Sequence, residues 1–155
     1  MVEIKKIMAV SWMTQTHRNV FQYAFSLAEK YGAELSVIHV IDDIWTQSNN
    51  LPAVSQTVEQ QRDAVRINKA LDGIISSEAK GNVKVNKIIK VGDPVREILK
   101  VIKEDKIDML ILRAHEESSI ERFLVRSSND ELIRKMPCSI LLVKSELEAK
   151  TSDED

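Results

Sequence analysis

The 155-residue sequence is poor in several residue types that mark particular classes of protein. Its single cysteine, Cys138, excludes an internal disulfide and fits a reducing compartment. No apolar run approaches the ~20 residues that span a bilayer, and the opening MVEIKK lacks the apolar region of a signal peptide. The formal net charge of −2 gives no general attraction to nucleic acid or anionic membranes. We therefore expect a cytoplasmic domain that binds neither nucleic acid nor membrane.

Glycine is scarce as well, and its positions matter. The four glycines are Gly32, Gly73, Gly81 and Gly92, and none lies between residues 112 and 128. A loop that cradles phosphates needs glycines, because positive φ and the missing Cβ let backbone N–H groups approach the ligand. The sequence therefore offers no Gly-rich phosphate loop, and each glycine is assigned to a helix or to a turn.

Short apolar or β-branched runs alternate with segments of helical periodicity. This alternation predicts an α/β domain with a five-stranded, mainly parallel sheet and helices on both faces. The length fits one domain, which we place at residues 1–145, followed by an acidic, disordered tail at 146–155. Lysines at 84, 87 and 90 place the third strand near a sheet edge. The expected strands cover residues 7–10, 35–41, 83–91, 107–112 and 140–143.

The sequence marks several helix ends. Gly32 stands where a left-handed C-terminal cap is expected after the first helix, since glycine takes positive φ without strain. We expect Asp93 to cap a later helix and Pro94 to occupy its first position, where a missing N–H has no consequence. Ser128 and Glu131 have the spacing of a capping box, which predicts that the last helix begins there.

A long helix is predicted between the second and third strands. Val58, Val65, Leu71 and Ile75 suggest helical spacing, which predicts a long helix from about Thr57 to Lys80. A glycine within this helix costs about 1 kcal/mol relative to alanine. The polar stretch before it is expected to form a long loop.

Residues 109–144 read as strand, loop, helix and strand. In open α/β sheets, ligands bind beyond the carboxyl ends of the strands. The loop that follows Leu112 is therefore the expected ligand site.

Several segments, in order, resemble the universal stress protein family. The resemblance covers nearly the whole chain, to about Lys144, and implies a small flavodoxin-like or Rossmann-like α/β fold. The matching segments are Lys6-Ile7-Met8, AEKYGAELSVIHV (28–40), VGDPVREIL (91–99), IDMLIL (107–112) and ELIRKMPCSILLV (131–143).

Many members of this family bind ATP through a glycine pattern after strand four. The three glycine positions of that pattern correspond here to Arg113, Glu116 and Arg126, whereas Ser127 keeps the final hydroxyl position. The acidic residue that usually follows strand one corresponds to Trp12 or a neighbour. The departures gather on the ligand site, and Glu116 adds a negative charge near the phosphates. The resemblance therefore implies a degenerate nucleotide site without a bound cofactor, and ATP or AMP is the alternative.

The candidate ligand-site residues leave alternatives open. Arg113 and Arg126 can form a substitute anion site or belong to a solvated loop whose charges glutamates offset, and we favour the loop. The Trp12 indole can stack on a base or fill the vacated pocket itself, which we favour. Ser127 and Ser128 can contact a phosphate, although helix capping explains at least one of them. The full candidate set is Ser11, Trp12, Ile41, Arg113, Glu116, Arg126, Ser127 and Ser128.

Other reactive side chains indicate structural roles. His17, His39 and His115 lie on separate elements without metal-ligand spacing, so we expect no metal site. Cys138 begins an expected buried strand, which favours a core thiol over a nucleophile. We find no serine in a nucleophile elbow and no carboxylate pair with catalytic placement, so we predict no catalytic residue.

The last strand is the predicted oligomer interface. Many relatives pair this strand across a two-fold axis, so the resemblance implies a symmetric homodimer. A monomer whose tail covers the strand is the alternative. The predicted interface comprises Ser139, Ile140, Leu141, Leu142, Val143 and Lys144.

The leading functional interpretation is a non-catalytic stress-response module that regulates by binding an unidentified protein partner. The second is an ATP- or AMP-binding switch, or weak ATPase, with a rebuilt phosphate site around Arg113, Arg126 and Ser127. The third is a receptor for another small ligand, with Trp12 and the loop at 42–52 forming its pocket.

Overall fold

The computed structural model describes residues 1–12, 18–43, 53–79, 81–114 and 121–144, and at 53–56 and 121–127 it describes the backbone alone. Strands and helices alternate along these ranges, as the sequence predicted. The elements are β1 (Lys6–Ser11), α1 (Arg18–Tyr31), β2 (Glu34–Asp42), α3 (Ala53–Glu78), β3 (Val85–Gly92), α4 (Pro94–Asp105), β4 (Met109–Arg113), α5 (Glu121–Lys135) and β5 (Ser139–Val143).

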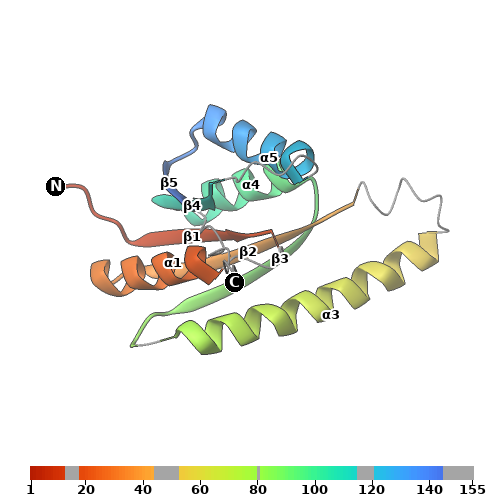
Figure 1. Cartoon of the computed structure of the whole chain (residues 1–155), viewed down its shortest axis with the longest axis horizontal. Helices are drawn as coiled ribbons and strands as arrows, with labels where there is room; N and C mark the ends of the chain where they lie inside the picture. The colour runs from red at the N-terminus through yellow and green to blue at the C-terminus, as the bar shows by residue number, and fades with distance from the viewer. Residues whose placement is uncertain (13–17, 44–52, 80, 115–120, 145–155) are drawn as a thin grey trace, which may run out of the picture.

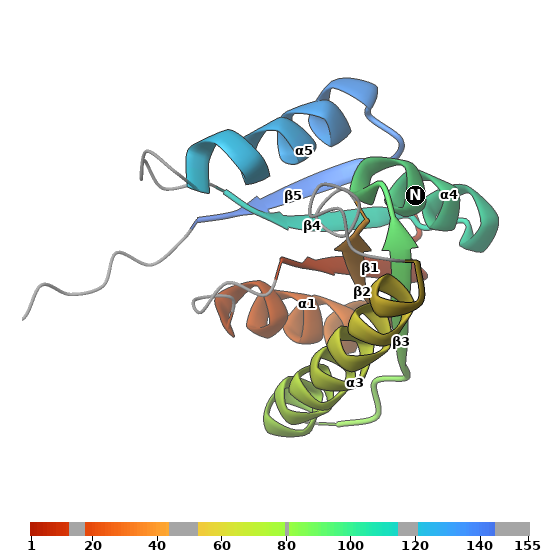
Figure 2. The same ribbon diagram turned by 90° about the vertical axis from the view of Figure 1, so that its right-hand side faces the viewer.

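The strands form one five-stranded sheet in the order β3-β2-β1-β4-β5 (Figure 1). All four neighbouring pairs are parallel, which confirms the predicted fold class. Helices α1 and α3 cover one face of the sheet, and α4 and α5 cover the other (Figure 2). The basic strand β3 lies at one edge, as predicted, and β5 lies at the opposite edge.

The core consists of two clusters, one on each face of the sheet. Alternate side chains of β1 divide between them: Ile7 and Ala9 face α1 and α3, whereas Met8 and Val10 face α4 and α5. All four are essentially inaccessible to solvent. Because both faces of this strand are covered, its sequence is a continuous apolar run rather than an alternating one.

Two helix ends form as the sequence predicted. Gly32 follows α1 with φ of 64°, the left-handed conformation that glycine adopts without strain. The Asp93 side chain accepts a hydrogen bond from the Arg96 N–H at 2.8 Å, and Pro94 is the first residue of α4. These contacts need only residues close in sequence, so local chemistry is enough to predict them.

The predicted long helix is present as α3, although its predicted bounds were wrong. The helix begins at Ala53, not Thr57, and Val58 and Val65 are 44% and 70% exposed. Leu71 is buried in the core together with Ile67, and Ile75 packs against it. Although α3 is the longest helix described, no helix in the described ranges is both long and apolar enough to cross a membrane.

The predicted start of the last helix was also wrong. Helix α5 begins at Glu121, so Ser128 lies inside the helix and does not cap it. The segment before Ser128 contains neither glycine nor proline, and its Glu, Arg and Leu residues favour helix. The predicted tail at 146–155 lies outside the described residues.

Candidate functional site

The topology creates one switch point, between β1 and β4. Strand β1 continues into the helix layer formed by α1 and α3, whereas β4 continues toward α5 on the other face (Figure 2). The carboxyl ends of these neighbouring strands bring Ser11 and Trp12 to the same edge of the sheet as Arg113 and Ala114. Open α/β sheets bind ligands at such a position.

A buried histidine supports the end of β1. Nδ1 of His39 lies 2.8 Å from the backbone carbonyl oxygen of Ser11, its partner in the register of β1 and β2. Because a carbonyl only accepts hydrogen bonds, Nδ1 carries the proton and donates. Burial lowers the pKa of His39 and outweighs the hydrogen bond, which raises it. The side chain is therefore a neutral imidazole that fixes the Ser11 peptide group.

Two asparagines support the ends of the strands beyond β1. Nδ2 of Asn129 in α5 donates to the Arg113 carbonyl at 3.0 Å. Nδ2 of Asn19 in α1 donates to the Lys144 carbonyl at 2.7 Å. Both asparagines are more than nine-tenths buried. The carboxyl edge of the sheet is thus held by side chains from both helix layers.

Several buried polar atoms at this edge have no hydrogen-bond partner within the described residues. They are the Ser11 hydroxyl, the Trp12 indole N–H and the Oδ1 atom of Asn19. Ser11 is 1% exposed, so water does not replace the missing partner through open solvent contact. Buried polar groups are satisfied in most proteins, and clustered exceptions point to bound water or ligand. Among the described residues, the edge therefore has polar atoms that the fold leaves unpaired.

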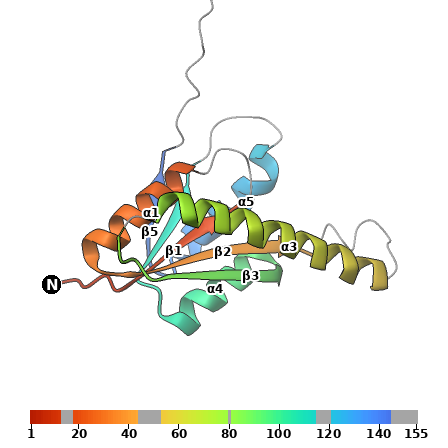
Figure 3. The same ribbon diagram turned by 90° about the horizontal axis from the view of Figure 1, so that it is seen from below.

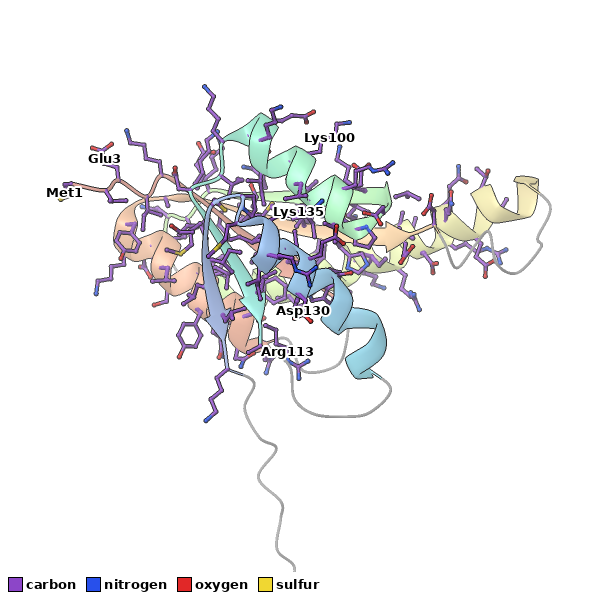
Figure 4. The ribbon with its side chains drawn as sticks, turned by 90° about the horizontal axis from the view of Figure 1, so that it is seen from above. Met1, Glu3, Lys100, Arg113, Asp130 and Lys135 are labelled. Atoms are coloured by element: carbon purple, nitrogen blue, oxygen red, sulfur yellow. The ribbon has the colours of Figure 1, made fainter. Side chains whose placement is uncertain are left out.

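Four of the candidate residues meet at or near this edge. Ser11 is the last residue of β1 and Trp12 follows it, and Arg113 ends β4 at the carboxyl side of the sheet (Figure 4). Trp12 is half-buried against the core beneath α4 and α5, and Ile41 is buried in the core on the opposite face. The candidate set is therefore divided between the two faces of the sheet.

The remaining candidates lie in or before α5. Ser128 is a half-buried residue inside this helix, and the backbone of Arg126 and Ser127 belongs to it. Glu116, His17 and His115 lie outside the described residues. The substitute anion site around Arg126 accordingly remains a prediction.

Sequence reasoning missed the roles of Asn19 and Asn129. Each bonds a carbonyl far away along the chain, 125 and 16 residues distant. One signal was present: asparagine is a poor helix former, so its occurrence within α1 and α5 calls for a polar contact. That signal identifies the residue but not the carbonyl it binds.

A surface hollow of about 440 Å³ lies elsewhere, at the amino ends of β2 and β3. Glu34 and Lys84 line it and form an exposed ion pair at 3.2 Å. The hollow is at the opposite end of the sheet from the switch point, so it is not the site that the topology indicates. Exposed ion pairs of this kind add little stability.

The sheet order and the polar edge define a Rossmann-like α/β domain with its candidate site at the switch point. The chain belongs to the universal stress protein family, whose pattern it matches over residues 3–144. Universal stress protein MJ0577 of Methanocaldococcus jannaschii is 24% identical over 92% of this chain and 96% of its own. Universal stress protein YxiE of Bacillus subtilis is 24% identical over 78% of this chain and 86% of its own.

Solved structures have the same fold. The structure of MJ0577 superposes with a TM-score of 0.79 at 22% identity, covering 95% of this chain and all of its own. A universal stress protein in complex with cAMP superposes with a TM-score of 0.68 at 14% sequence identity. The match covers 94% of this chain and all of that one. The universal stress protein from Archaeoglobus fulgidus in complex with dAMP superposes with a TM-score of 0.65 at 18% sequence identity. The match covers 93% of this chain and 100% of that one.

Proposed function

We propose that this protein is a non-catalytic regulatory module of the cytoplasmic stress response that acts by binding another protein. In this proposal the switch point has lost the phosphate cradle of ATP-binding relatives. The observation that carries it is the position of the glycines. Gly32 and Gly81 adopt positive φ between elements, Gly92 does so as the last residue of β3, and Gly73 lies inside α3, so none is at the end of β4. Backbone N–H groups cannot approach a polyphosphate closely past the Cβ atoms of other residues.

Trp12 supports the same proposal. Its side chain packs against the core beneath α4 and α5 directly after β1, where an acidic residue is usual in the family. An indole buries a large apolar area and supplies no carboxylate for a ribose or a metal ion. Its placement favours a switch point that the protein fills with its own side chain.

Isothermal titration calorimetry with MgATP tests the proposal, with a thermal melt as a second readout. We expect no heat and no stabilisation, because a ligand of the native state raises stability by mass action. Binding at micromolar affinity would overturn it. The matched variant combines Arg113→Gly, Glu116→Gly and Arg126→Gly, which restores the glycine spacing, and we expect this variant to gain affinity for MgATP if it folds.

A second candidate function is binding of a nucleoside monophosphate. The buried, unsatisfied Ser11 hydroxyl and Trp12 N–H favour it, because a small polar ligand at the switch point could satisfy both. The relatives in complex with cAMP and dAMP hold ligands of that class. AMP and cAMP titrations of the wild type and of Ser11→Ala separate the two candidates: a heat that the variant loses would favour the ligand-binding function.

A symmetric homodimer through β5 is part of the proposal. Strand β5 is an edge of the sheet, and Leu142 is 47% exposed on it. An apolar edge strand pairs readily with a second copy of itself. Light scattering after gel filtration should give the mass of a dimer, and Leu142→Lys should shift it toward the monomer. A monomeric wild type at micromolar concentration would contradict the dimer.

A further inference from the structure

Helix α3 is the outermost element on its face of the sheet. Figure 1 and Figure 3 both show its first turns running past the carboxyl ends of β2 and β3. Its buried side chains in the core are Ile67 and Leu71, which are 4% and 0% exposed, and Ala64, Ile74 and Ile75 also pack against this core. The opposite side of the helix therefore faces away from the sheet.

Four side chains form a straight line along that outward side. Val58, Arg62, Val65 and Lys69 are spaced by four, three and four residues, so they fall within a narrow arc of the helix surface. All four are exposed, Val65 to 70%. We refer to these four residues as the outer ridge.

The outer ridge carries positive charge only. In the described part of the chain, neither Arg62 nor Lys69 has an ion pair. The carboxylates of the helix lie elsewhere or are already paired: Asp63 binds Arg66 at 3.2 Å, and Asp72 binds Lys87 of β3. Glu59 lies three residues before Arg62, about 60° from it around the helix, and the two form no ion pair in the described part of the chain. The outer ridge thus combines apolar and unpaired cationic groups, with no acidic group among them.

Neither valine belongs to the two core clusters of the domain. Valine is a weaker helix former than alanine, so at these exposed positions it slightly destabilises the helix. Isolated exposed apolar residues are common, but apolar anchors two turns apart, with one cation between them and another one turn further on, match how one helix recognises another. The chemistry of the ridge specifies the charge of its partner.

We propose that the outer ridge is the docking surface for an acidic amphipathic helix of a partner protein. Apolar side chains of that helix would pack on Val58 and Val65, and its carboxylates would pair with Arg62 and Lys69. Charge complementarity selects this occupant, because a second outer ridge would repel the first. Two valines on a protein of net charge −2 bury too little apolar area to hold a membrane surface. The inference rests on the proposed function, since it names the partner chemistry of the interaction module.

Fluorescence anisotropy with a defined synthetic peptide tests this inference. The probe is a labelled helical peptide with leucines two turns apart flanked by glutamates, and the control peptide has lysines in place of the glutamates. We expect the acidic peptide to bind the full-length protein and the basic peptide not to bind. The double variant Arg62→Glu/Lys69→Glu should weaken binding by about tenfold or more, and Val65→Ser should weaken it less. Lys100→Glu, an exposed charge on α4 (Figure 4), is the matched control and should bind as wild type does.

Several outcomes would overturn the inference. They are equal affinity of the wild type and the double variant, equal affinity for both peptides, or no binding at about 1 mM peptide. Binding to phosphatidylserine vesicles without binding to the peptide would assign the ridge to a membrane instead. Amide chemical-shift changes in labelled protein locate the contact and should be confined to residues 57–70.

The nucleotide titrations and the peptide titrations test the proposed function and the outer ridge separately. Micromolar MgATP binding would remove the proposed loss of the nucleotide site and leave the ridge result intact. Loss of peptide binding in the double variant, together with no heat on nucleotide titration, would support both the loss of the nucleotide site and the role of the outer ridge. If the wild type binds neither the acidic peptide nor a nucleotide, the proposed interaction module would stand but the outer ridge would not be its binding surface.

Discussion

The Nδ1 atom of His39 donates a hydrogen bond to the carbonyl oxygen of Ser11 at 2.8 Å, across the pair formed by β2 and β1. The bond holds the last peptide group of β1 in place at the switch point. Burial lowers the pKa of His39 and keeps the imidazole neutral, although the hydrogen bond to Ser11 opposes this shift. Site geometry and pH dependence are therefore coupled through one side chain.

The stability of the protein should fall as the pH drops below the ordinary histidine pKa of about 6.5. The unfolded chain binds a proton to His39 there, whereas the folded chain does not, so the free energy of unfolding declines until the lowered folded pKa is reached. Arg66 of α3 lowers this pKa further, and Asp63 opposes it. Urea denaturation at pH 7.5 and pH 5.5 measures the change.

The control for this prediction is His39→Asn, which keeps an N–H donor near Nδ1 but does not titrate. The stability difference between the wild type and this variant should shrink from pH 7.5 to pH 5.5. A constant difference would show that carboxylates elsewhere cause the pH dependence, and that protonation of His39 is not coupled to folding.

The order of elements and several helix ends could be predicted from the sequence, because each depends on local chemistry. The Asp93-Pro94 cap and the left-handed Gly32 are examples. The apolar residues that predict α3 do not by themselves identify its buried face, for a geometric reason. Val58 and Val65 are two turns apart and share a side, but Leu71 lies 13 residues after Val58, about 140° away around the helix. Because the apolar residues of α3 lie on two sides of the helix, they cannot all face the sheet.

Asp108 ties the amino end of β1 to the turn before β4. Its Oδ2 atom accepts hydrogen bonds from the N–H groups of Lys5 and Lys6, at 2.8 and 2.9 Å. Asp108→Ala should lower the free energy of unfolding by about 2 kcal/mol, because two backbone donors lose a charged acceptor. Asp108→Asn should cost less, since the amide oxygen still accepts. Urea denaturation measures both changes.

Asp105 is the matched control for the Asp108 variants. It is an exposed carboxylate at the end of α4, where the helix dipole disfavours negative charge. Asp105→Ala should therefore change stability by less than about 0.5 kcal/mol. An equal loss from both alanine variants would mean that net charge matters and the two hydrogen bonds of Asp108 do not.

The candidate site was less predictable than the fold. Ser11, Trp12 and Arg113 could be placed near one another because parallel strands bring their carboxyl ends to the same edge. The supporting bonds of Asn19 and Asn129 could not be placed, because they join segments that meet only after the helices pack on the sheet. Long-range side-chain contacts leave no periodic pattern in a sequence.

Cys138 should react slowly with alkylating reagents in the native protein. Burial raises the pKa of its thiol, and the nearby Asp108 carboxylate raises it further, although a backbone hydrogen bond at Leu110 acts in the opposite direction. The thiolate is the reactive form, so iodoacetamide at pH 7.5 should modify the native chain more slowly than the urea-unfolded chain. Equal rates would show that the thiol is open to solvent and not perturbed.

Leu71 and Val65 should differ sharply in their effect on stability, although both are apolar residues of α3. Leu71 is fully buried, and Leu71→Ala should lower the free energy of unfolding by about 2–5 kcal/mol through lost contacts and a cavity. Val65 is 70% exposed, and Val65→Ala should leave stability unchanged or raise it by a few tenths of a kcal/mol, because alanine is the better helix former. Guanidinium denaturation of both variants measures the contrast.

A loss above about 1 kcal/mol for Val65→Ala would mean that this side chain packs within the domain or its homodimer. The outer ridge would then be a structural contact, with no valine free for a partner helix.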